Sequence, residues 1–139
     1  MGSFRLDSDA NNKIIRLSFE GEETGQVLRD AQAALRSCWE RLGPWPCIVD
    51  LTGVTEATFP SEDVRTIARI QPVVSMDCLL VAVAPKDVTY GLARMFELLI
   101  SEEHGPYVRV VHTMDEALKL IGVLSPTFTP LDDDFREIA

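Results

Sequence analysis

The chain has 139 residues, of which 46% are hydrophobic and 25% are charged, the balance of an ordinary globular domain. Its net charge of −9 repels phosphate backbones and anionic lipid surfaces, so we expect no nucleic-acid partner. No apolar run approaches the roughly 20 residues of a membrane span, so we expect no membrane insertion. The three cysteines match no zinc or paired-cysteine spacing, which predicts reduced thiols, no metal, no cofactor and a cytoplasmic location.

An antiparallel hairpin is predicted at the N-terminus. Phe4 to Asp9 forms a short edge strand, and Ala10-Asn11-Asn12 is a turn signal. Lys13 to Glu20 follows with apolar and polar residues in alternation, which indicates a strand with one buried face.

The clearest predicted helix spans Glu22 to Leu42. Thr24 is a candidate cap, and Gly43 followed by Pro44 ends the helix. Apolar residues recur at three- and four-residue spacing and form one stripe, made of Val27, Leu28, Ala31, Ala34, Leu35, Cys38, Trp39 and Leu42.

The middle of the chain alternates between strands and helices. Cys47 to Leu51 is a short apolar strand, followed by a loop from Thr52 to Pro60. Ser61 is a good cap for a helix that runs to about Gln71. The continuously apolar segment Cys78 to Ala84 predicts a strand with both faces covered.

The second half contains two more helices and one more strand. The first helix runs from Val88 to about Glu102, with a predicted buried stripe of Val88, Leu92, Met95, Phe96 and Leu99. Tyr107 to Val111 is a strand, and Thr113 begins the last helix with a capping box to Glu116.

The order ββαβαβαβα predicts an α/β fold with a mixed, mostly parallel sheet of five strands. We expect one domain over residues 1–123. Residues 124–139, which include the acidic run Asp132 to Asp134, are predicted to be a tail laid on the surface or partly disordered.

One segment resembles a known family. Ile48-Val49-Asp50-Leu51-Thr52-Gly53-Val54-Thr55 is similar to the strand end of STAS domains, named for sulfate transporters and anti-sigma factor antagonists. The predicted element order is also that of the STAS fold. The resemblance implies a bacterial signalling module that works through protein–protein contact.

STAS regulators carry a phosphorylated serine at the start of the next helix, where an added dianion abolishes a docked surface. Here Thr58 falls on the motif's aspartate, Phe59 and Pro60 on its serine pair, and Ser61 on its glycine. The standard phosphoacceptor is therefore absent. Ser61 is either a plain helix cap or, with Thr58, a replacement acceptor after a shift of the loop.

The second half resembles uncharacterised bacterial STAS-like proteins, a group discussed together with the lipid-exchange CRAL-TRIO proteins. The similarity lies in Ala84 to Asp87, Tyr90 to Phe96 and Val108 to Val111. Lys86, Tyr90 and Arg94 also form a lone basic cluster, because Tyr90 and Arg94 are four residues apart on a helix. This cluster is a candidate contact for an anion or for an acidic group of a partner.

Catalysis is not expected. The glycines form no phosphate-binding loop, and His104 and His112 have no evident nucleophile or orienting acid. A receiver domain built on Asp50 and Lys86 is disfavoured by the opening hairpin.

The sequence therefore predicts a non-enzymatic STAS-like module that binds an unidentified protein partner and forms a homodimer. Its predicted switch-loop residues are Asp50, Thr52, Thr58, Phe59 and Ser61. The alternatives are a domain that binds a lipophilic or anionic small molecule and an enzyme that uses His104 or His112.

Overall fold

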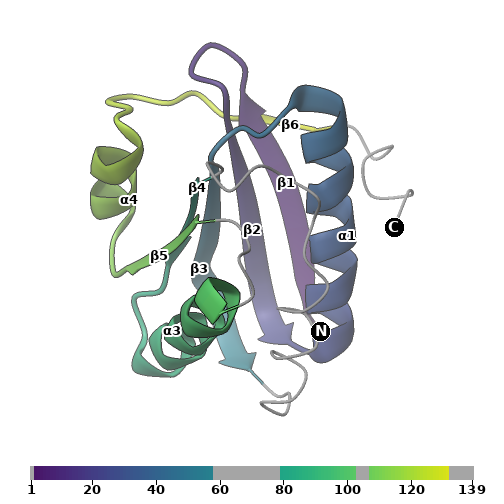
Figure 1. Ribbon diagram of the computed structural model, residues 1–139. Helices are drawn as coiled ribbons and strands as arrows, with labels where there is room; N and C mark the ends of the chain where they lie inside the picture. Colours follow the sequence, from purple (N-terminus) through teal and green to yellow (C-terminus); the bar gives the residue numbers. More distant parts are fainter. Residues whose placement is uncertain (1, 58–78, 103–106, 132–139) are drawn as a thin grey trace.

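The structure is a computed structural model that describes residues 2–57, 79–102 and 107–131. Within these ranges it is an α/β fold with a six-stranded mixed sheet in the order β5-β4-β3-β2-β1-β6 (Figure 1). Strands β2, β3, β4 and β5 run parallel, whereas β1 and β6 are antiparallel to their neighbours. The α/β class and the opening hairpin are thus confirmed, but the sheet has six strands instead of the five predicted.

The N-terminal hairpin joins β1 (Ser3–Asp9) to β2 (Ile14–Glu23) in a continuous register from Ser3↔Glu20 to Asp9↔Ile14. Lys13 has a φ of 56° in the connecting turn. The alternation seen in the sequence holds, because Ile15, Leu17 and Phe19 all face the main core.

Helix α1 (Gly25–Leu42) begins where the sequence predicted a cap. The Thr24 hydroxyl accepts a hydrogen bond from the backbone N–H of Val27 at 3.3 Å. At the other end Gly43 has a φ of 103°, and its N–H donates to the Trp39 carbonyl at 2.9 Å.

The second half of the sheet has short, buried strands. β4 (Leu79–Val83) and β5 (Tyr107–Val111) lie close to the predicted bounds, and β3 (Cys47–Ala57) runs well beyond its predicted end at Leu51. α3 (Asp87–Glu102) connects β4 to β5. The predicted helix from Ser61 to Gln71 lies outside the described residues.

Helix α4 (Met114–Ile121) has the predicted capping box. The Thr113 hydroxyl accepts from the Glu116 N–H at 3.2 Å, and the Glu116 carboxylate accepts from the Thr113 N–H at 3.1 Å. After this helix the chain crosses to the far edge of the sheet, where β6 (Thr129–Pro130) pairs with β1. This short strand was not predicted.

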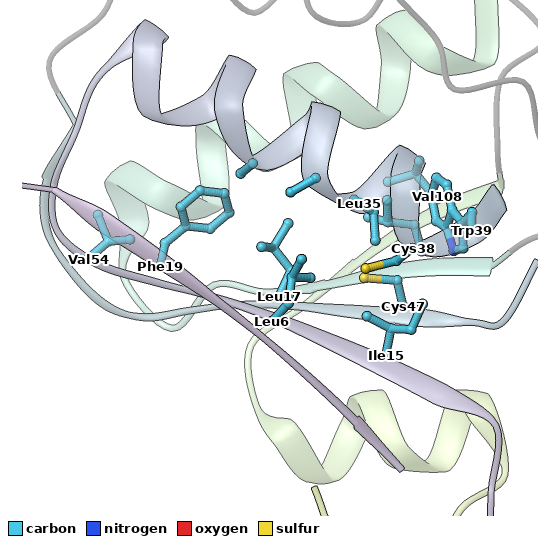
Figure 2. Close-up of a cluster of buried hydrophobic side chains, with 13 residues drawn as sticks. Leu6, Ile15, Leu17, Phe19, Leu35, Cys38, Trp39, Cys47, Val54 and Val108 are labelled. Carbon is cyan, nitrogen blue, oxygen red and sulfur yellow. The ribbon is translucent and has the colours of Figure 1, made fainter. Parts of the chain in front are cut away.

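The helices form two layers around the sheet. Helix α1 connects β2 to β3, and α3 connects β4 to β5. Both connections cross the sheet in the same direction and are right-handed, so α1 and α3 lie on one face and α4 lies on the other (Figure 2). The larger core fills the space under α1 and includes Leu17, Phe19, Leu35 and Trp39. A smaller cluster lies under α4.

Candidate functional site

The carboxyl ends of the parallel strands meet at one edge of the sheet, which is where open α/β sheets usually bind ligands. The register places Asp50 of β3 beside Val83 of β4, and Val83 beside Val111 of β5. After the carboxyl end of β4 the chain continues into α3, and after that of β5 it continues into α4. This edge therefore collects several of the residues that the sequence singled out.

Asp50 fixes a bulge in β3. From Ser18 to Glu20 strand β2 advances two residues, while β3 advances three, from Asp50 to Gly53. The extra residue in β3 turns its backbone, and the Asp50 carboxylate accepts a hydrogen bond from the Thr52 N–H at 2.9 Å. The predicted switch-loop residues Asp50 and Thr52 thus belong to a strand, with Asp50 bonded to a nearby amide.

Lys86 ties the start of α3 to the same strand. Its ammonium group donates a hydrogen bond to the Val54 carbonyl of β3. Its own carbonyl accepts from the Tyr90 N–H at 2.9 Å and from the Thr89 hydroxyl at 3.0 Å, which closes the first turn of the helix. The charge of Lys86 is thereby directed onto the backbone of β3.

Tyr90 stacks on His112 across the gap between α3 and the end of β5. Their ring centroids lie 4.2 Å apart and the rings are within 4° of parallel. The backbone N–H of His112 donates to the Glu116 carboxylate at 3.3 Å, which joins this residue to the cap of α4. Sequence spacing paired Tyr90 with Arg94 and gave no signal for the histidine, because the two rings come from different elements.

Arg94 has a separate partner. Its guanidinium forms an ion pair with Glu97 one turn later on α3. The predicted basic cluster is therefore divided, with Lys86 bound to β3, Tyr90 stacked on His112 and Arg94 paired with an acid.

The orientation of α3 differs from the prediction. Val88, expected in the buried stripe, is 66% exposed, and Leu98 is 57% exposed, whereas Thr89 and Glu97 are buried. Leu92 and Met95 are half-buried. The Thr89 hydroxyl bonds to the Lys86 carbonyl and the Glu97 carboxylate to Arg94, so both buried polar groups have partners within the helix and its first turn. The side chains of Phe96 and Leu99 lie outside the described residues.

Glu23 at the end of β2 is a second buried acid that sequence reasoning missed. The register places it opposite Ala57, and 3% of its surface is exposed. Burial raises the pKa of this carboxyl from its ordinary 4.5 to about 7. The prediction had assigned this residue to the start of the helix, where a solvated glutamate is normal.

Other predicted groups lie outside the described residues. Thr58, Phe59, Ser61 and His104 are among them, so the predicted phosphoswitch stays a prediction. Within the described residues no cluster of histidine, cysteine, aspartate or glutamate is arranged to hold a metal ion. In that same part of the chain, no helix has both the length and the apolar character needed to cross a membrane.

No family model matches the chain, and no curated protein matches it. The resemblance to STAS domains consequently rests on the sequence segment around Asp50, because the structure agrees with the α/β class but does not show the specific STAS order.

Proposed function

We propose that this chain is a non-enzymatic interaction domain of the STAS type that docks a protein partner on the outward face of α3. The observation that carries the proposal is the exposure of two large apolar side chains on this helix. Val88 and Leu98 are exposed while Thr89 and Glu97 are buried. Val88, the half-buried Met95 and Leu98 follow one side of the helix and form its apolar stripe, with Gly91 between the first two. A soluble domain gains by covering such an apolar stripe.

The charged residues near this stripe support a binding role over a chemical one. Lys86 and Asp50 hold the backbone of β3, and the His112 ring is stacked on Tyr90. A general base needs a proton donor within about 3 Å in a substrate pose. Among the described residues, the contact of the His112 ring is a stack on the aromatic ring of Tyr90, and not a hydrogen bond to a nucleophile or to an orienting acid.

The STAS assignment, a bacterial signalling role, a cytoplasmic location and a homodimeric state belong to the same proposal. They are supported by the segment Ile48 to Thr55, by the α/β fold with its opening hairpin and by the acidic charge of −9.

The proposal is tested by quantitative affinity capture from the native cell with two matched variants. Val88→Asp places a charge in the α3 stripe, and Leu124→Asp places the same charge at a 97% exposed leucine outside α3. We expect a partner that is enriched by the wild type and by Leu124→Asp, and lost at least tenfold with Val88→Asp. Circular dichroism checks that each variant is folded. Equal recovery of every protein by the two variants would rule out docking on α3.

A second candidate function is binding of a small aromatic or anionic molecule at the Tyr90–His112 pair. The stacked rings lie beside the first turn of α3, at the strand edge where α/β folds hold ligands. Native mass spectrometry of protein purified from its own cell tests this reading. A bound mass that disappears with Tyr90→Ala supports it, and unliganded protein in both samples contradicts it.

A further inference from the structure

The segment from Thr127 to Leu131 lies along the outer edge of β1, opposite the side that pairs with β2. Pro130 is opposite Asp7, and Thr129 is opposite Ser8. The Leu131 N–H donates to the Leu6 carbonyl at 3.0 Å, and the Thr129 hydroxyl donates to the Ser8 carbonyl at 3.4 Å. We call residues 127–131 the C-terminal clasp.

Two side-chain contacts place the clasp beside the hairpin. The Thr127 N–H donates to the Asp9 carboxylate at 2.9 Å. The Phe128 ring lies against the guanidinium of Arg16, whose central carbon is 4.3 Å from the ring centroid. These contacts join residues more than 100 positions apart in the sequence.

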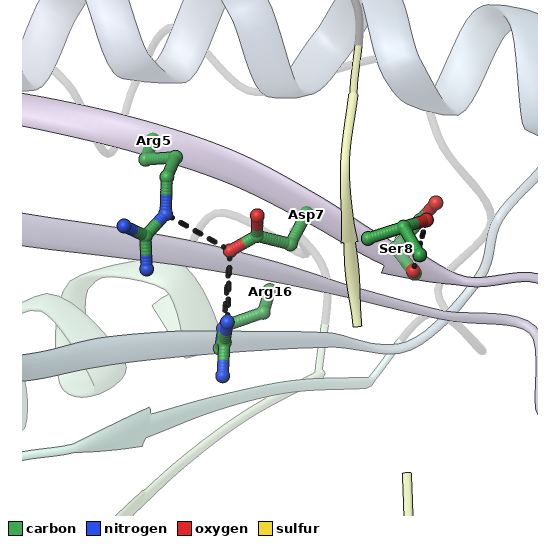
Figure 3. Close-up of polar contacts among 5 residues, drawn as sticks. Arg5, Asp7, Ser8 and Arg16 are labelled. Atoms are coloured by element: carbon green, nitrogen blue, oxygen red, sulfur yellow. Dashed lines mark hydrogen bonds and ion pairs between the residues drawn. The ribbon is translucent and has the colours of Figure 1, made fainter. Parts of the chain in front are cut away.

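The surface that receives the clasp is fixed by contacts inside the hairpin. Asp7 is 2% exposed, and one of its oxygens accepts from Arg16 at 3.0 Å and from Arg5 at 3.2 Å (Figure 3). Asp9 accepts from both the backbone and the side chain of Asn12. These bonds lie within the hairpin, so their formation does not require the clasp.

The clasp itself is joined to the domain by a short connection. The N–H groups of Gly122 and Val123 both donate to the Leu118 carbonyl and end α4. Leu124, next in the chain, is 97% exposed. Pro130 has no N–H group, so it removes one donor from the pairing with β1.

We propose that the β1 edge also accepts the clasp of a second copy, so that two chains exchange residues 127–131 and form a dimer. We choose a second copy as the partner because residues 127–131 of this chain are the segment that pairs with the β1 edge in the structure. The inference deepens the homodimer part of the proposed function and is independent of docking on α3. Each chain's own clasp competes with the clasp of the second copy for the β1 edge, and its effective concentration there is in the millimolar range. Exchange therefore increases with protein concentration.

The test places one cysteine on each of two full-length chains. One chain carries Ser8→Cys and the other carries Thr129→Cys, the residue directly opposite in the register. Opposed residues of an antiparallel pair have Cα atoms about 5 Å apart, within the range for a disulfide. Both chains carry Cys78→Ser, and the native Cys38 and Cys47 are buried. A single chain with both substitutions serves as the check that this disulfide forms.

We expect mild oxidation of the mixture, at about 1 mM chain, to yield a disulfide-linked dimer of one copy of each. The matched control replaces Thr129→Cys by Leu124→Cys, whose thiol is more exposed but lies outside the clasp. Collision alone would favour the control. A higher yield of disulfide-linked dimer from the Ser8→Cys and Thr129→Cys mixture than from the control mixture therefore supports exchange.

Phe128→Ala supplies a directional test. On the Ser8→Cys chain it removes the contact with Arg16 and the packing of this half-buried ring against the cluster under α4. It therefore weakens that chain's own clasp and should raise the yield of mixed dimer at least about two- to fivefold, the effect of the cation–π contact alone. On the Thr129→Cys chain it should lower the yield by a similar factor. If the double-cysteine chain forms its internal disulfide while the mixture yields no more dimer than the control, the exchange does not occur.

Discussion

Glu23 allows a quantitative test of how the end of β2 is buried. The carboxyl is 3% exposed, and burial raises its pKa from 4.5 to about 7. Because a difference of one pKa unit corresponds to about 1.4 kcal/mol, the burial costs at most about 3.5 kcal/mol once the group is ionised. Glu23→Gln removes this charge while keeping the size of the side chain.

The sign of the effect follows from proton binding. Below pH 4.5 the carboxyl is protonated in the folded and the unfolded chain, so it adds no pH dependence. Between pH 4.5 and 7 the unfolded chain loses the proton first, and the wild type becomes less stable as the pH rises. Above pH 7 the penalty is complete and constant.

Urea unfolding followed by circular dichroism at pH 4, 6 and 8 measures the difference. We expect Glu23→Gln and the wild type to differ least at pH 4, and the variant to gain up to about 3.5 kcal/mol relative to the wild type by pH 8. Glu20→Gln, which removes an exposed carboxylate from the same strand, is the control. A difference between Glu23→Gln and the wild type that is the same at all three pH values would refute the reasoning.

Three further predictions concern stability and reactivity. Thr113→Ala removes the cap of α4 and should lower the free energy of unfolding by about 1 kcal/mol in urea titrations, whereas Thr113→Ser should leave it nearly unchanged. Trp39→Phe removes the indole N–H that donates to the Trp45 carbonyl at 3.0 Å and should cost about 1–2 kcal/mol; a cost near zero in the same titration would show that this bond contributes little. Burial raises the pKa of the Cys38 thiol to about 11, so mass spectrometry after iodoacetamide treatment at pH 8 should find Cys38 unmodified in the native protein and modified in urea.

Local signals in the sequence were sufficient for most elements. Thr24 and Thr113 cap helices as predicted, because a cap depends on residues three positions away. The strand Tyr107–Val111 has the predicted bounds. Alternation along β2 predicted which residues face the core, since a strand with one buried face has a period of two.

The errors come from pairings between distant residues. β3 extends through Thr52 to Ala57 because β2 continues to Glu23 beside it, yet these polar residues have the composition of a loop. β6 has two residues, one of them proline, and pairs with β1 more than 120 positions away. Such contacts leave no periodic signal in either segment.

The candidate site was predicted in part. Lys86, Tyr90 and Asp50, which the sequence assigned to two separate candidate sites, lie close to the carboxyl ends of neighbouring strands. The Tyr90–His112 stack was missed because its two rings come from different elements, and the exposure of Val88 was missed because the burial of a helix end depends on which elements pack there. Apolar periodicity alone places Val88 inside.

Site-specific photo-crosslinking tests the central claim, that a partner docks on α3, most directly. A photoreactive phenylalanine analogue is placed at position 88 in one sample and at position 124 in the other, and each protein is irradiated in the native cell. Both positions hold exposed aliphatic residues, so the exposure of the probe is comparable. The account predicts one abundant adduct to a single protein from position 88 and none of that adduct from position 124. The same adducts from both positions, or none from position 88, would contradict it.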